Sequence, residues 1–419
     1  MLSPPDAAPY RIRSTCRICE SRDLVPILDL GDMPLANALR EPADTGPELR
    51  IPLCVMLCQE CSLSQLSAVV SPERMFSRYV YRSGIAETFR RHCSWFAREA
   101  KKIARPGRGA LVVDIGGNDG TLLHAFRAEG FRPLAVEPAA NIAEIARAGG
   151  IDTMNAFWSR ATAKALVEQW GRPALITATN VFAHVDDLDD FLSGVTDALD
   201  EKGCFVLEVP YMADLIEKNE FDTIYHEHLS YFLLRPLLRL ADRHELEAKY
   251  VRRIPVHGGG LRVYLKRKSG RTFHAETAQA MLSFEEEAGL YTHSPYRNFA
   301  RQIDSIRRDL RETMMRLIGD GRTVAAYGAS AKGATLLNSA GIDRGMIRYI
   351  VDDTPEKQGR LAPGTGIPIV GAKELETARP DYLLILAWNF VDEILAKTSA
   401  FSQAGGRYIV PVPALRYIE

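Results

Sequence analysis

The chain has 419 residues, of which 46% are hydrophobic, and its 52 lysines and arginines nearly balance 53 aspartates and glutamates. This length predicts two or three domains, and the net charge of -1 disfavours a protein that binds nucleic acid. The chain contains no apolar run of about 18 residues, so no membrane span is predicted. The N-terminal residues lack the basic and apolar regions of a signal peptide. We therefore expect a cytoplasmic protein that does not act at a membrane.

Cysteines are concentrated at the start of the chain, in a segment that we assign to residues 1–78. Five of the seven lie there, and four of them form two Cys-x-x-Cys pairs, Cys16 with Cys19 and Cys58 with Cys61. Two such pairs can surround a zinc ion at about 2.3 Å, and a β-rich insert is expected between them. Cys54 is a competing ligand, but it lies in an apolar, strand-like run, so we favour the other four. Four protein ligands predict a structural zinc; a redox motif or core cysteines are the alternatives.

Residues 79–252 show the alternation of strands and helices that is typical of a doubly wound α/β sheet. A helix is expected over 85–104. After it comes an apolar strand, a glycine-rich turn and a second helix, and the next strand also ends in an acid. The turn has the pattern D-x-G-x-N-x-G, which is similar to motif I of class I S-adenosylmethionine methyltransferases, with asparagine at the central glycine. The residues that we predict to bind this cofactor are Asp114, Gly116, Asn118, Gly120, Glu137 and Asn180. NAD binding and a purely structural turn are the alternatives.

The segment Tyr225-His226-Glu227-His228 concentrates side chains that can move protons, and it uses two of the nine histidines. Histidine titrates near neutral pH, a carboxylate can orient an imidazole, and a phenol can donate to a developing oxyanion. By itself the segment also fits a solvated polar turn. His184 follows the fourth predicted strand, at the edge of the sheet where ligands bind. We therefore expect His184 and this segment to meet above the cofactor.

Residues 253–419 contain a glycine loop with His257, a long charged helix over about 275–317, and a second Rossmann-like α/β unit. The turn of this unit carries Gly328, Ser330 and Lys332, and the last two suit a diphosphate at a helix N-terminus. A later strand leads into Trp388 and Asn389, which we expect to contact a base or a sugar. A degenerate scaffold with a solvated lysine is the alternative.

Taken in order, five motifs resemble those of the nucleotide-sugar C-methyltransferase family over nearly the whole chain. They are the paired Cys-x-x-Cys, VVDIGGNDG, YHEH, HGGGLR and YGASAKGAT. The best-known members of this family methylate C3 of TDP-linked 4-keto-deoxysugars on the way to branched antibiotic sugars. The resemblance implies a structural zinc, S-adenosylmethionine in the middle domain, and a C-terminal domain that holds the nucleotide of a TDP-linked keto-sugar. One departure is Gly260, which stands where many relatives have serine.

The resemblance also implies roles for individual residues. His228 is the expected base, with Glu227 and Tyr225 beside it, and His184 and Tyr79 complete the pocket. The base removes the C3 proton next to the 4-keto group, a hydrogen-bond donor stabilises the enolate, and the enolate attacks the methyl group in line. An O- or N-methyltransferase and a non-catalytic nucleotide-binding protein are the alternatives. We expect a monomer.

Overall fold

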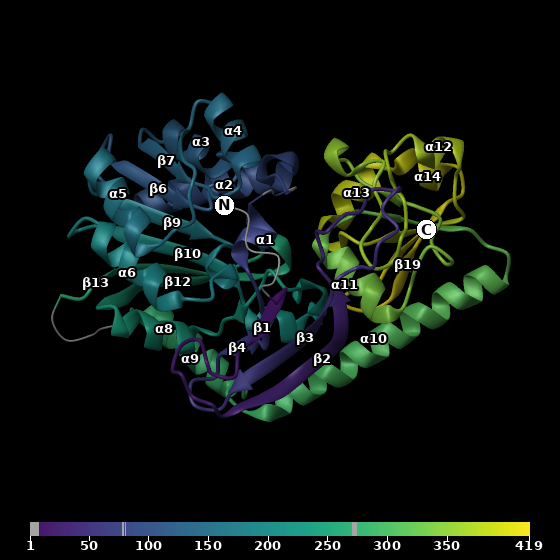
Figure 1. Cartoon of the computed structure of the whole chain (residues 1–419), viewed down its shortest axis with the longest axis horizontal. Coiled ribbons are helices and arrows are strands. Elements are labelled where there is room, and N and C mark those ends of the chain that lie inside the picture. Colours follow the sequence, from purple (N-terminus) through teal and green to yellow (C-terminus); the bar gives the residue numbers. More distant parts are fainter. Residues whose placement is uncertain (1–7, 78, 80, 270–274) are drawn as a thin grey trace.

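The computed structural model describes residues 8–77, 79, 81–269 and 275–419. Two α/β lobes lie side by side, and the N-terminal sheet lies between them at their base (Figure 1). The longest helix, α10 (His293–Gly319), runs along this base and packs against the first long strand, β2 (Leu24–Pro34), and against both lobes. In the described part of the chain no helix is long and apolar enough to cross a membrane.

The N-terminal module is built on a four-stranded antiparallel sheet in the order β11-β4-β3-β2. A long hairpin of β2 and β3 fills the stretch between the two cysteine pairs, which confirms the predicted β-rich insert. Alternate residues of β3 are buried, as expected for a strand with one face on a core. The last strand, β11, comes from far along the chain. The other elements are β1 (Tyr10–Ile12), β3 (Arg50–Cys58), β4 (Ser64–Leu66), β5 (Ala68–Val70), α1 (Pro72–Phe76) and β11 (Ser230–Tyr231).

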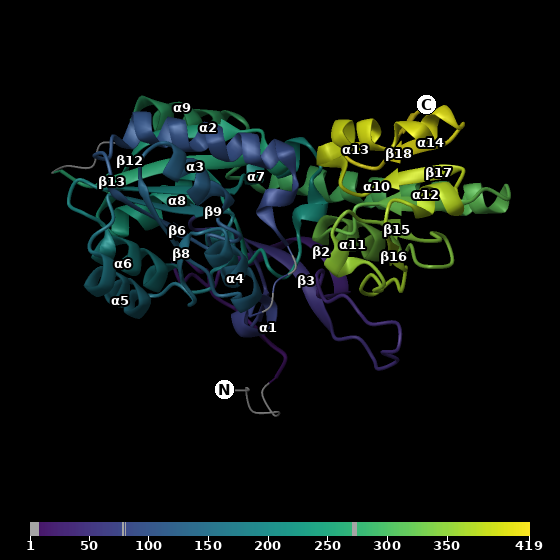
Figure 2. The same ribbon diagram turned by 90° about the horizontal axis from the view of Figure 1, so that it is seen from above.

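The central lobe contains a seven-stranded sheet in the order β12-β13-β10-β9-β6-β7-β8. Strands β6 to β10 run parallel, which confirms the doubly wound prediction, and β13 and β12 add an antiparallel edge. Helices α2 and α3 pack on one face, and α5 and α6 pack on the other (Figure 2). The strands are β6 (Leu111–Ile115), β7 (Arg132–Val136), β8 (Asp152–Met154), β9 (Leu175–Thr179), β10 (Cys204–Pro210), β12 (Leu246–Ile254) and β13 (Gly260–Arg267). The helices are α2 (Glu87–Ala104), α3 (Thr121–Ala128), α4 (Ala140–Ala148), α5 (Arg160–Trp170), α6 (Leu188–Ala198), α7 (Met212–Glu217) and α8 (Leu234–Arg243).

The predicted division between residues 252 and 253 does not coincide with the end of this sheet. It falls within β12, and β13 pairs with both β12 and β10, so the sheet continues to Arg267. The glycine loop of residues 257–260 is therefore the connection between two strands of the central sheet.

The C-terminal lobe contains a six-stranded sheet in the order β16-β15-β14-β17-β18-β19, parallel except for β19. This is the second Rossmann-like unit expected from the sequence. Its strands are β14 (Val324–Tyr327), β15 (Ile350–Val351), β16 (Ile369–Val370), β17 (Tyr382–Ile385), β18 (Arg407–Val410) and β19 (Arg416–Ile418). Its helices are α11 (Ala331–Ala340), α12 (Glu374–Thr377), α13 (Val391–Lys397) and α14 (Ser399–Gln403).

The prediction of one long helix over 275–317 is wrong. The segment forms two helices, α9 (Glu276–Glu287) and α10, joined by a short turn. Gly289 in this turn has φ +67°, a left-handed conformation that ends a helix. Pro295 then lies in the first turn of α10, where a missing N–H costs nothing.

Candidate active site

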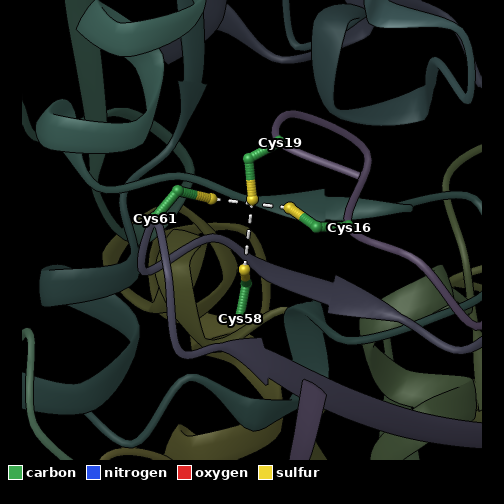
Figure 3. Close-up of side chains that lie close together, drawn as sticks. All are labelled: Cys16, Cys19, Cys58 and Cys61. Carbon is green, nitrogen blue, oxygen red and sulfur yellow. Dashed lines mark hydrogen bonds between the residues drawn. The ribbon is translucent and has the colours of Figure 1, made fainter. Parts of the chain in front are cut away.

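The four predicted cysteines converge on one point (Figure 3). Their sulfur atoms all lie within 4.8 Å of one another, and Cys16 and Cys61 are 3.4 Å apart. A tetrahedral zinc site with Zn–S bonds of about 2.3 Å places its sulfurs about 3.8 Å apart, so these residues fit a zinc ion. A hydrogen bond from Cys61 lowers the pKa of Cys16 to about 5, which favours the thiolate that a metal requires. Cys54 lies outside this group, with its sulfur 3.7 Å from Met56.

The glycine turn lies at the carboxyl ends of β6, β7 and β9, as predicted. Gly116, Asn118 and Gly120 all have positive φ, and a Cβ on Gly116 would lie 2.3 Å from the Val181 side chain. The Asn118 N–H donates to Glu137 Oε2 at 2.9 Å, so the acid at the end of β7 borders the turn. Asn180 follows β9 with φ +56°.

The turn offers a close backbone approach next to polar groups, which fits S-adenosylmethionine. Thr179 adds a buried hydroxyl oxygen at this edge that has no partner among the described residues.

Asp114 differs from the other predicted cofactor residues because it lies inside the sheet. Asp114 is a residue of β6 and is 3% exposed, and Thr177 Oγ1 donates to Asp114 Oδ1 at 2.7 Å. Burial raises the pKa of Asp114 to about 7. In this structure the carboxyl group joins β6 to β9 beneath the turn.

The side chain of Asn118, at the central position of the turn, forms hydrogen bonds to the backbone of a neighbouring segment. Asn118 Oδ1 accepts from the Ser83 N–H at 2.9 Å, and its amide donates to the Tyr81 carbonyl at 3.2 Å. The Gly84 N–H donates to Asp119 Oδ2 at 2.8 Å. These bonds hold the 81–84 segment against the glycine turn.

His228 has partners on both ring nitrogens. Nδ1 lies 2.8 Å from the Thr223 carbonyl oxygen, which can only accept, so Nδ1 carries the proton. Nε2 lies 3.0 Å from the Tyr225 hydroxyl and accepts from it. His228 is only 6% exposed, so the solvated-turn alternative for this segment is wrong. The arrangement leaves a basic lone pair on Nε2, facing a phenol.

Glu227 is the buried carboxylate of the site. Oε2 accepts from the Tyr79 hydroxyl at 2.8 Å and Oε1 accepts from the Asn37 amide at 2.6 Å. Burial raises the pKa of Glu227, and both donors oppose that rise. Asn37 lies just after β2 in the N-terminal module, and the sequence did not indicate it, because an asparagine in a short turn is common. His226 points elsewhere, and its Nε2 donates to the Ile51 carbonyl at 3.1 Å.

His184 completes the cluster. It ends a short 3-10 helix, Phe182–His184, after β9, and its ring lies 5.0 Å from that of His228. The Phe76 ring stacks on the His184 ring, with the two ring centres 5.2 Å apart. Burial lowers the pKa of His184 to about 4, so the ring is neutral near pH 7. The five predicted catalytic residues thus lie together: Tyr79, His184, Tyr225, Glu227 and His228.

Lys332 and Trp388, two of the predicted substrate residues, face the 220–222 segment. Lys332 Nζ lies 3.7 Å from Glu220 Oε2 and 4.9 Å from the centre of the Trp388 ring. The Trp388 Nε1–H donates to Asp222 Oδ2 at 2.6 Å. The alternative of a solvated lysine is wrong, because this side chain is 14% exposed and paired.

The other predicted substrate residues are divided between the turn after β14 and two 3-10 helices. Gly328 has φ +96°, and Ser330 Oγ caps α11 by accepting from the Gly333 N–H at 3.1 Å. Asn389 lies in the 3-10 helix Trp388–Phe390. The backbone of His257 belongs to the 3-10 helix Val256–Gly258, and its side chain lies outside the described part of the structure.

Arg262, in the HGGGLR motif, is a buried structural residue. It forms ion pairs with Glu208 and Glu99, and its guanidinium lies 3.8 Å from the centre of the Phe96 ring. These contacts fasten α2 to β13 and β10 behind the cofactor turn.

Comparison with known proteins gives matches along most of the chain. Residues 16–76 match a family described as "Putative zinc binding domain", 85–250 a methyltransferase domain, and 255–413 a C-methyltransferase C-terminal domain. The C-methyltransferase NovU of Streptomyces niveus is 35% identical over 405 residues, which are 96% of each chain. The chain belongs to the C-methyltransferase family.

Solved structures resemble this C-methyltransferase less closely. The PH0226 protein of Pyrococcus horikoshii OT3 is 11% identical, with a TM-score of 0.37, over 47% of this chain and 98% of its own. Magnesium protoporphyrin IX methyltransferase of Synechocystis PCC 6803, solved with bound S-adenosylmethionine, is 9% identical, with a TM-score of 0.32, over 43% of this chain and 79% of its own. The sequence relative and the family models therefore establish an S-adenosylmethionine-dependent C-methyltransferase with a zinc-binding module.

A C-methyltransferase needs a nucleophilic carbon in its substrate. A base in the active site can produce one by removing a proton from that carbon. S-adenosylmethionine would supply an electrophilic methyl group, and the turn bordered by Gly116, Asn118 and Glu137 is the place predicted to hold it. His228 Nε2 can take a proton from a carbon acid, and the Tyr225 hydroxyl beside it can donate to the oxygen that becomes negative. The burial of this cluster strengthens both interactions.

Proposed function

We propose that this C-methyltransferase transfers a methyl group to C3 of a TDP-linked 4-keto-deoxysugar through an enolate, in the synthesis of a branched deoxysugar. The observation that carries the proposal is the tautomer of His228: its Nδ1–H donates to the Thr223 carbonyl, so Nε2, which lies 3.0 Å from the Tyr225 hydroxyl, carries the basic lone pair. The resemblance of the five motifs to the nucleotide-sugar C-methyltransferases supports the choice of substrate.

The proposed step balances within the site. The C3–H bond breaks, its proton goes to His228 Nε2, and its electron pair moves toward the 4-keto oxygen, which becomes the enolate oxygen. Tyr225 lies 3.0 Å from the base and is the first candidate donor to that oxygen. Tyr79, whose hydroxyl donates to Glu227 in this structure, and neutral His184 are further candidates in the same cluster. C3 of the enolate would then bond to the methyl carbon of S-adenosylmethionine while the sulfur–methyl bond breaks; the electron pair of that bond goes to sulfur, and S-adenosylhomocysteine leaves.

We further propose that the C-terminal lobe holds the nucleotide at the N-terminus of α11. Ser330 caps this helix and Lys332 lies in its first turn, so backbone N–H groups and a cation lie where a diphosphate would bind. Because Lys332 is paired with Glu220 in this structure, the proposal requires it to exchange or share that partner when the substrate binds.

Product analysis tests the proposed function directly. The enzyme is incubated with a TDP-linked 4-keto-2,6-dideoxysugar and S-adenosylmethionine carrying a ¹³C-methyl group, and the product is examined by ¹H–¹³C correlation NMR. We expect a methyl carbon bonded to C3, with couplings to C2 and C4. A methyl group on oxygen or nitrogen would overturn the proposal in favour of an O- or N-methyltransferase.

A further inference from the structure

Arg17 lies between the first two zinc ligands and is 2% exposed, which is unusual for an arginine. Three of its groups are bonded. Its backbone N–H donates to Gln65 Oε1 at 2.8 Å, its NH1 group donates to the Leu66 carbonyl at 3.0 Å, and its Nε–H donates to Asp186 Oδ1 at 2.9 Å.

The bond to Asp186 connects the zinc site to one active-site histidine. Asp186 lies two residues after His184, directly beyond the short helix that carries it. Arg17 is the buried partner of this carboxylate. Arg13 lies 3.5 Å from Oδ1 of the same residue, and Arg11 pairs with it from a side chain that is 57% exposed.

The bonds to Gln65 and Leu66 connect the zinc site to the other histidine. Both residues belong to β4, which follows the Cys58–Cys61 pair and is antiparallel to β11, with Gln65 opposite Ser230. The Leu66 N–H donates to the Leu229 carbonyl at 3.0 Å, one residue after His228. One buried side chain therefore contacts the supports of both His184 and His228.

We propose that Arg17 is a positioning residue that couples the zinc site to the separation of His184 and His228, whose rings lie 5.0 Å apart. Zinc bound by Cys16 and Cys19 would fix the backbone of Arg17, which lies between them in the sequence. From this fixed backbone the guanidinium can hold both Asp186 and the Leu66 carbonyl in place. The inference rests on the proposed function only for the role of His228 as base. A misplacement of about 1 Å between catalytic groups costs about 10²-fold in rate.

The first test compares Arg17→Met with Arg11→Gln. Both variants remove an arginine from Asp186, but only the first removes the buried one. For Arg17→Met we expect a zinc content and an S-adenosylhomocysteine affinity close to those of wild type, with kcat at least about tenfold lower and KM little changed. Arg11→Gln should match wild type in every readout, because exposed ion pairs contribute little. Wild-type kcat in a zinc-loaded Arg17→Met protein would overturn the proposal.

A further variant, Asp186→Asn, tests the role of Arg17 if Arg17→Met loses zinc or does not fold. It changes no residue of the cysteine module, and it removes only the negative charge that follows His184. In protein labelled with ¹³C at histidine Cε1, the signal of His184 should move in Asp186→Asn and stay in place in Arg11→Gln; His184→Gln provides the assignment. This readout needs no sugar, so a wild-type enzyme that methylates no 4-keto-sugar would sink the proposed function separately. Unchanged His184 signal and kcat in folded Asp186→Asn would overturn the role of Arg17.

Discussion

The two active-site histidines differ in the partners of their ring nitrogens. His228 has a partner on each nitrogen, and this fixes its tautomer. His184 Nε2 is buried and has no partner among the described residues. Burial lowers the pKa of His184 and so keeps its ring neutral near pH 7.

The low pKa of His184 predicts a pH-dependent contribution to stability. The pKa is about 4 in the folded protein, against 6.5 for an ordinary histidine. Between these values only the unfolded chain binds the proton, so the free energy of unfolding falls as the pH falls from about 6.5 to about 4. We expect His184→Gln to show a smaller loss of Tm than wild type between about pH 7 and about pH 4.5, measured by circular dichroism. An equal or greater loss in the variant contradicts the burial argument.

Asn37 and Tyr79 donate to different oxygens of the same carboxylate, and both lower the pKa of Glu227. Removing either donor should raise that pKa. We expect the acid limb of the kcat–pH profile to move to higher pH in Asn37→Ala and in Tyr79→Phe, and the double variant shows whether the two donors act independently. Profiles that coincide with that of wild type would show that the ionisation of Glu227 does not matter for turnover.

At the scale of elements, the catalytic segment is part of the zinc module's sheet. β11 begins two residues after His228 and pairs with β4, which follows the second cysteine pair. The zinc site therefore supports the strand that follows the proposed base, although the metal takes no part in the proposed reaction.

This pairing predicts the effect of removing the metal. We expect chelated protein to lose at least about tenfold in methyl transfer, because β4 is no longer anchored at its start. The affinity for S-adenosylhomocysteine, measured by calorimetry, should change much less, because Gly116, Asn118 and Glu137 lie in turns that follow strands of the central sheet. Full activity without zinc would show that the module does not position the base, and readdition of zinc serves as the control for irreversible damage.

The sequence predicted those features whose determinants are local. Ligand spacing identified the four cysteines, and the strand–glycine–helix order identified the turn of residues 114–120. The two-residue strand β11 has no periodicity of its own, and its partner is more than a hundred residues away, so its place was not predictable from the pattern. Asn37 and Arg17 were missed for the same reason, since their roles arise from contacts between distant segments.

At the scale of the whole molecule, all three parts of the chain meet at the segment before His228. Thr335 on α11 donates to the Ile224 carbonyl at 3.1 Å, and Trp388 donates to Asp222. Tyr225 borders a small cavity of about 10 Å³ between the end of β2 and α11. The C-terminal lobe therefore contacts the residues on either side of Thr223, whose carbonyl fixes the tautomer of His228.

Trp388→Phe tests this contact between lobes, with Trp158→Phe as a matched control. Each variant loses one indole N–H donor, since Trp158 donates to the Phe191 carbonyl at 3.1 Å, in the central lobe. We expect both variants to lose about 1–3 kcal/mol of unfolding free energy, and only Trp388→Phe to show a lower kcat. Equal kcat values in the two variants would show that the C-terminal lobe does not position the base.

Exchange of the substrate's C3 proton with solvent tests the central claim most directly. The enzyme is mixed in D₂O with a TDP-linked 4-keto-2,6-dideoxysugar and S-adenosylhomocysteine, which cannot donate a methyl group, and the C3 proton is followed by NMR. We predict that the signal disappears faster than in a control without enzyme. With His228→Asn it should persist, exchanging about 10²-fold or more slowly. A C3 proton that persists with wild type, or that exchanges equally fast with His228→Asn, would contradict an enolate formed by His228.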